Sequence, residues 1–165
     1  MEMKRYPLLK VTPAVLLLFL FIGVSGQGGF DNPTRAVYIF DMAKYIDYGP
    51  GFADSSVFRI GILDSGNDLL FEMGNLARTR KTIQEKPVQL VVFRSEDKII
   101  HTQVLYVNKE SGFNLQKVKN MIEGHQTMLI TEGFAFRESM INFVVVDGKP
   151  RFEANEELIR KAGMS

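Results

Sequence analysis

Two short polar segments of the sequence combine residue types that bind small ligands. Asp64-Ser65-Gly66-Asn67 follows the apolar stretch 57–63 and precedes a helical pattern, and Thr131-Glu132-Gly133 ends another strand-like run. Ligands of open α/β sheets bind beyond the carboxyl ends of strands, and backbone N–H groups at helix starts favour anions. Turn formation and capping are the ordinary explanation of the same residues. The spacing therefore predicts a candidate ligand crevice lined by Asp64, Ser65, Gly66, Asn67, Thr131, Glu132 and Gly133.

The other residues of catalytic type have structural explanations. His101 and His125 are the only histidines, they lie 24 residues apart, and no cysteine is present to complete a zinc site. We expect both at the surface or at loop ends. Glu156 and Glu157 follow Asn155, where they would complement a helix dipole beside its cap. No nucleophile elbow, P-loop or dinucleotide fingerprint is recognisable after residue 26. We therefore predict no enzymatic activity, no catalytic residue, no metal site and no cofactor.

The pattern of apolar residues predicts alternating helices and strands. Asn32-Pro33 is typical of a helix start, and Gly49-Pro50-Gly51 of the chain after a helix. Strands are predicted at 57–63, 88–93, 103–107 and 128–131, and further helices at 68–77 and 115–122. This alternation predicts one three-layer, Rossmann-like α/β domain, with a mostly parallel sheet and helices on both faces.

The C-terminal third predicts a β-hairpin followed by a helix. Asp147-Gly148 separates two strand-like runs, 142–146 and 149–153, and Asp-Gly is a strong hairpin signal. We expect a positive φ at Gly148 and a buried Phe152. Asn155 is expected to cap the final helix.

Four residues are candidate contacts for another protein. Arg151 and Glu153 are two apart in a strand, so they share a face that Phe152 does not. An ion pair or edge protection is the ordinary role of such a pair. Tyr45 and Tyr48 lie near the exit of the first helix; core packing is their ordinary role, but aromatic residues are also enriched at interfaces.

The first 26 residues resemble a signal peptide. Lys4, Arg5 and Lys10 precede the apolar run 14–24, and Val24-Ser25-Gly26 supplies small residues for cleavage. We expect export to the periplasm and a single domain over 27–165; an uncleaved anchor is the alternative. Without cysteine, neither a lipid-modified cysteine nor a disulfide is available.

The charge of the expected mature chain argues against nucleic acid as a partner. Cleavage would remove three of 20 basic residues and one of 19 acidic residues, leaving 17 and 18 and a net charge of −1. A phosphate-binding surface needs a basic excess that this chain lacks.

Several segments together resemble the YfiR-like family of exported bacterial α/β domains. The clearest is 140–163, MINFVVVDGKPRFEANEELIRKAG; 40–46 (FDMAKYI), 58–63, Lys86-Pro87-Val88 and 104–107 (VLYV) match in the same order. The resemblance implies a non-enzymatic regulatory domain that contacts a membrane signalling protein from the periplasmic side. The alternative is a periplasmic domain that binds a small molecule in the predicted crevice. A homodimer also stays open.

Overall fold

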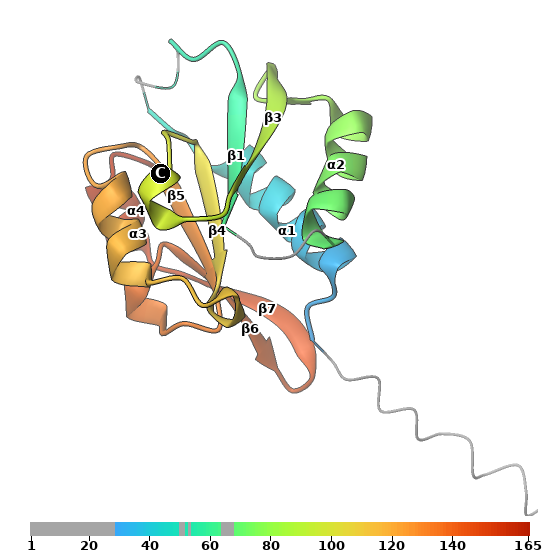
Figure 1. Ribbon diagram of the computed structural model, residues 1–165, viewed down its shortest axis with the longest axis vertical. Helices are drawn as coiled ribbons and strands as arrows, with labels where there is room; N and C mark the ends of the chain where they lie inside the picture. The colour runs from blue at the N-terminus through green and yellow to red at the C-terminus, as the bar shows by residue number, and fades with distance from the viewer. Residues whose placement is uncertain (1–28, 50–51, 53, 64–67) are drawn as a thin grey trace, which may run out of the picture.

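A seven-stranded sheet forms the centre of the computed structural model, which describes residues 29–49, 52, 54–63 and 68–165 (Figure 1). The strand order is β2-β3-β1-β4-β5-β6-β7. Neighbours from β3 to β6 run parallel, whereas β2 and β7 pair antiparallel at the two edges. The strands are β1 (Phe58–Leu63), β2 (Thr82–Ile83), β3 (Lys86–Phe93), β4 (Val104–Asn108), β5 (Met128–Glu132), β6 (Ile141–Val146) and β7 (Lys149–Ala154).

Within the described residues, four α-helices accompany the sheet: α1 (Asn32–Tyr45), α2 (Asp68–Arg80), α3 (Leu115–Ile122) and α4 (Glu156–Lys161). Side-chain caps start three of them, because Asp31, Asn114 and Asn155 accept hydrogen bonds from backbone N–H groups of the first turns. The first helix is thus capped by Asp31, one residue before the predicted start. Three short 3₁₀ segments, η3 (Glu96–Lys98), η4 (Lys109–Ser111) and η5 (Phe136–Glu138), lie in connections.

Two hydrophobic clusters lie against the sheet. The larger one joins α1 and α2 to the strands through residues such as Phe40 and Met73, and it includes Ile159 of α4. The smaller one joins Leu115 and Val118 of α3 to the strands. In Figure 1, α1 and α2 lie together on the right and α3 and α4 on the left. The structure therefore shows a mixed α/β fold with a mostly parallel sheet; the Rossmann-like three-layer arrangement stays a prediction.

The C-terminal hairpin has the predicted register. β6 and β7 pair antiparallel with Val146 opposite Lys149, so Asp147-Gly148 forms the turn. Both turn residues have positive φ, 51° at Asp147 and 69° at Gly148, which is the geometry of a type I′ turn. The side chain of Asn155 caps α4 by accepting a hydrogen bond from Leu158 N at 3.2 Å.

The predicted burial of Phe152 is wrong. Its ring is 45 % exposed, although it lies opposite Phe143, which is 1 % exposed. Both rings are on the same sheet face, but Phe152 belongs to the edge strand, where Tyr38 is its one aromatic neighbour among the described residues, at 6.4 Å between centroids. Alternation assigned the face correctly, and the position of β7 at the edge of the sheet decided the burial.

Candidate functional site

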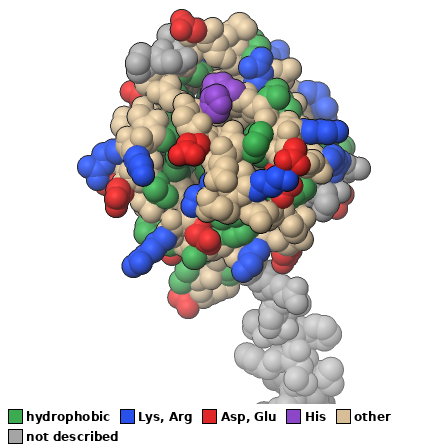
Figure 2. All heavy atoms as spheres, turned by 60° about the vertical axis from the view of Figure 1, so that its left-hand side comes forward, with side chains coloured by type: hydrophobic (Ala, Val, Ile, Leu, Met, Phe, Trp, Pro, Cys, Tyr) green, Lys and Arg blue, Asp and Glu red, His purple; other side chains and the backbone are tan. Residues whose placement is uncertain are grey.

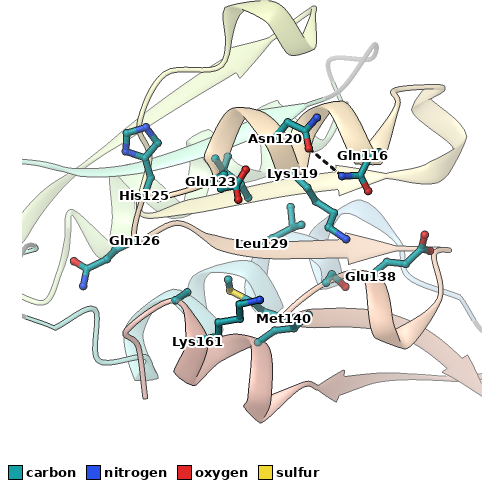
Figure 3. A pocket seen from close by; sticks show the side chains of 15 residues that line it. Gln116, Lys119, Asn120, Glu123, His125, Gln126, Leu129, Glu138, Met140 and Lys161 are labelled. Atoms are coloured by element: carbon teal, nitrogen blue, oxygen red, sulfur yellow. Dashed lines mark hydrogen bonds between the residues drawn. The ribbon is translucent and has the colours of Figure 1, made fainter.

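A cavity of about 420 Å³ lies between α3, α4 and the segments that lead into β5 and β6 (Figure 3). Its apolar wall includes Leu129 of β5 and Met140 and Leu158 from the C-terminal region. Figure 3 shows Lys119 reaching from α3, and Lys161 from α4, toward the space between the two helices. The remaining lining residues are Gln116, Asn120, Ile122, Glu123, Gly124, His125, Gln126, Glu138, Ser139 and Ala162.

The lining of the cavity suits a ligand with an apolar body and an anionic group. Neither Lys119 nor Lys161 forms an ion pair with any residue that the structure describes. Their ammonium groups are therefore available to an anion, and Leu129 and its apolar neighbours provide a surface free of charge, while the carboxylates of Glu123 and Glu138 line the same cavity. Pockets that bind small molecules combine an apolar lining with a few polar groups in this way.

The predicted crevice is a different place from this cavity. Asp64, Ser65, Gly66 and Asn67 lie outside the described residues. Thr131 is fully buried, and its hydroxyl contacts Ser139 Oγ at 2.6 Å and Asn142 Oδ1 at 3.0 Å. Gly133 has a φ of +80°, and a β-carbon there would come within 3.3 Å of Lys109. Of the predicted crevice residues that the structure describes, none lines the cavity between α3 and α4, so a ligand site at these residues stays a prediction.

Glu132 is already bound by protein groups. Arg35 Nε donates to one carboxylate oxygen at 2.7 Å and Nη2 to the other at 2.8 Å, and the Tyr106 hydroxyl donates at 2.7 Å. The hydrogen bonds with Glu132 raise the pKa of the Arg35 guanidinium. Asn32 Oδ1 accepts from Arg35 Nη1 at 2.8 Å. This network ties the start of α1 to the end of β5.

A model of the YfiR/HmsC-like family matches residues 32–165, which include every helix and strand described above. The chain belongs to the YfiR/HmsC-like family. A comparison with curated proteins found no match. Membership indicates a periplasmic regulatory domain, and the family is regulatory rather than known for enzymes. The resemblance of the segments in 40–63 and 140–163 is thereby confirmed.

In this YfiR/HmsC-like chain, the four predicted partner contacts do not form one surface. Tyr45 is 73 % exposed at the end of α1. Arg151 is exposed on β7, and Glu153 on the same strand accepts a hydrogen bond from Asn142 Nδ2 at 3.0 Å. Tyr48 is 1 % exposed, and burial raises the pKa of its hydroxyl, which donates to Ala43 O at 3.3 Å. Tyr48 is therefore a core residue, and the other three predicted contacts lie on two different elements, α1 and β7.

The hairpin also exposes apolar side chains that the sequence reasoning did not single out. Val145 is 48 % exposed, Val146 49 % and Phe152 45 %. We call these three residues, with Arg151, the hairpin surface. Strand alternation alone cannot find such a surface, because it assigns a face without saying whether a helix covers it.

The structure brings the two histidines together, which sequence spacing did not predict. Their ring centroids are 5.3 Å apart, and Figure 2 shows both side chains in purple at the surface. Partial desolvation lowers the pKa of His101, and the charges of His125 and Arg59 lower it further. Within the described ranges, no group of three or more His, Cys, Asp or Glu side chains is placed to hold a metal ion. None of the described helices combines the length and apolar character needed to cross a membrane.

Proposed function

We propose that this chain is an exported regulatory domain that acts by contacting a membrane signalling protein on the periplasmic side. The family match over 32–165 carries the proposal, because it covers the whole of the described fold. Residues 1–26, with their basic start and apolar run, support export.

The hairpin surface is the partner-contact region that the structure favours. Val145 and Val146 of β6, next to the edge strand, and Phe152 of the edge strand β7 are each about half exposed. The register places Val145 and Phe152 on one face of the hairpin and Val146 and Arg151 on the other, so the hairpin surface includes both faces. Interfaces combine apolar contacts at their centre with arginine and aromatic side chains. An edge strand that exposes apolar residues without a partner is also a risk for aggregation, which a bound partner would remove.

Crosslinking in the native envelope tests this proposal. The full-length chain is captured after crosslinking in intact cells, and the captured proteins are identified by mass spectrometry. We expect a membrane-spanning protein with a cytoplasmic signalling domain, recovered in lower yield with Phe152→Asp and with Arg151→Glu. Phe71→Asp is the matched control, because Phe71 is 65 % exposed on α2, away from the hairpin. Recovery of the chain alone, at normal expression, would contradict the proposal.

The cavity between α3 and α4 favours a second candidate function, binding of a small organic anion. The observation that supports it is the combination of about 420 Å³ of space with Lys119 and Lys161 facing it. The two functions are compatible, since a ligand at α4 would sit next to the hairpin that precedes this helix in the chain.

A thermal-shift screen of small carboxylates and organic phosphates tests the second function. A ligand at 100 times its dissociation constant adds about 2.7 kcal/mol to the free energy of unfolding. We expect Lys119→Met and Lys161→Met to lose that stabilisation, and Lys98→Met, on an exposed segment outside the cavity, to keep it. Stabilisation that is equal in all three variants would place the ligand elsewhere, and no stabilisation by any anion would exclude this function.

A further inference from the structure

The two histidines occupy equivalent positions on neighbouring parallel strands. The β4–β5 register pairs Val104 with Met128, so paired residues differ by 24 positions (128 − 104). His101 and His125 differ by the same 24 positions, and each lies three residues before its strand. The register of the sheet therefore brings the imidazoles together.

Hydrogen bonds continue this alignment beyond the strands. Met128 N donates to Gln103 O at 2.8 Å, and the hydroxyl of Thr127 donates to Thr102 O at 2.6 Å. His125 itself is held by its backbone, since its N–H donates to Ile122 O at 3.0 Å and its carbonyl accepts from Thr127 N at 2.9 Å. The backbones that carry both imidazoles are thus fixed relative to each other before any ligand binds.

The distance between the rings fits two ligands of one metal ion. Imidazole nitrogens at about 2.0–2.1 Å from one metal ion hold the two ring centroids roughly 5 Å apart at a tetrahedral angle and roughly 4.5 Å apart at the right angle of a square-planar Cu²⁺ site. The observed separation is 5.3 Å. Both side chains are exposed, so a metal ion has access and water can fill the other coordination positions.

We propose that His101 and His125 form a two-imidazole binding site for a first-row divalent transition metal, with Cu²⁺ bound most tightly. Imidazole suits copper, zinc and nickel, and the affinity of nitrogen ligands for divalent ions peaks at copper. The site is independent of the proposed partner contact, because it lies before β4 and β5 and the hairpin surface lies on β6 and β7.

The surroundings of the pair set the conditions for binding. A metal ion binds the neutral imidazole, so binding should weaken as the pH falls. Arg59 opposes a bound cation: its charge acts on His101, while its Nε donates to Gln89 Oε1 at 3.0 Å. Replacing Arg59 by a neutral residue should therefore strengthen metal binding, whereas removing either histidine should weaken it.

Titration of the untagged mature chain with CuCl₂ at pH 7.5 tests the site. We expect one Cu²⁺ per chain at the histidines, with an electron paramagnetic resonance spectrum that shows nitrogen coupling. His101→Ala and His125→Ala should each weaken binding at least about 10-fold, because loss of even a supporting contact around a metal costs about that much. Arg59→Gln should bind more tightly, and Phe71→Ala, at an exposed position on α2 outside the site, should bind as the unaltered chain does.

The double variant His101→Ala/His125→Ala measures Cu²⁺ bound elsewhere on the chain, including at its amino terminus. Both histidines are exposed, so the variants should keep the urea midpoint of the metal-free protein. Equal affinity and stoichiometry in the unaltered chain and the double variant would overturn the proposal. A loss with only one of the two single variants would also overturn it, because the proposed site needs both imidazoles.

Discussion

Phe143 and Phe152 face each other across the hairpin, and their replacement by alanine should have very different effects on stability. Phe143 is 1 % exposed, stacks on Phe30 at 4.9 Å between centroids, and contacts Tyr38 at 5.8 Å and Tyr106 at 6.1 Å. A buried Phe→Ala change costs about 3–5 kcal/mol, and the aromatic contacts place Phe143 in the upper part of that range, about 4–5 kcal/mol.

Phe152→Ala should cost much less. The ring is 45 % exposed, and burying a whole phenylalanine side chain is worth about 1.5–3 kcal/mol, so a half-buried ring loses about 1–1.5 kcal/mol. The assay is urea unfolding followed by far-ultraviolet circular dichroism, since the chain contains no tryptophan. The slope m should stay constant, so that the shift in midpoint reports stability.

Phe71→Ala is the control for a largely exposed ring, and it should change the free energy of unfolding by no more than about 0.5 kcal/mol. A loss with Phe152→Ala as large as the loss with Phe143→Ala would refute the reasoning. It would mean that the edge strand is covered in solution, by a second copy of the chain or by another segment.

Three further predictions concern the ion pair, the last helix and pH. Arg35→Met leaves the partly buried Glu132 without its cation and should lower the free energy of unfolding by about 2–3 kcal/mol, less than for a fully buried pair because the two side chains are 16–19 % exposed. In urea melts, Arg35→Met/Glu132→Gln should recover part of that loss, and no loss with Arg35→Met alone would refute the role of the pair. Asn155→Ala should cost about 1 kcal/mol in the same melts, and an unchanged midpoint would refute the cap. The folded-state pKa of His101 lies below the ordinary histidine value of 6.5, so the unfolded chain binds more protons than the folded chain as the pH falls below 6.5. The free energy of unfolding should therefore be independent of His101 above pH 6.5 and should fall as the pH drops below 6.5. This fall should be smaller in His101→Gln, and the same pH profile in both proteins would refute the prediction.

The sequence predicts the hairpin and the parallel strands because their signals are local. Asp147-Gly148 imposes its own turn geometry, and the register of β6 with β7 follows from it. The apolar runs 88–93 and 128–131 lie within β3 and β5, whose bounds differ from the expected ones only at the ends. The turn at Gln84-Glu85 was not predicted, since both residues have positive φ (47° and 66°) and neither is glycine or asparagine.

The candidate sites depend on which distant segments pack together, and the periodicity of apolar residues in the sequence does not indicate this. The cavity forms where α3 meets α4, and nothing local in 115–122 indicates which helix lies beside it. The histidine pair depends on the pairing of β4 with β5, so the common offset of 24 positions becomes a signal only once that pairing is assumed. Phe152 shows the same effect, because its burial depends on which strand is last in the sheet.

Site-specific photo-crosslinking in living cells tests the central claim most directly. A photoreactive amino acid is placed at position 152 on the hairpin surface and, in a second strain, at position 71 on α2. Contact with a membrane signalling protein predicts an adduct of that protein from position 152 and none from position 71, formed in the periplasm of intact cells. Adducts of the same proteins from both positions, or none from position 152 in cells that export the chain normally, would contradict the account.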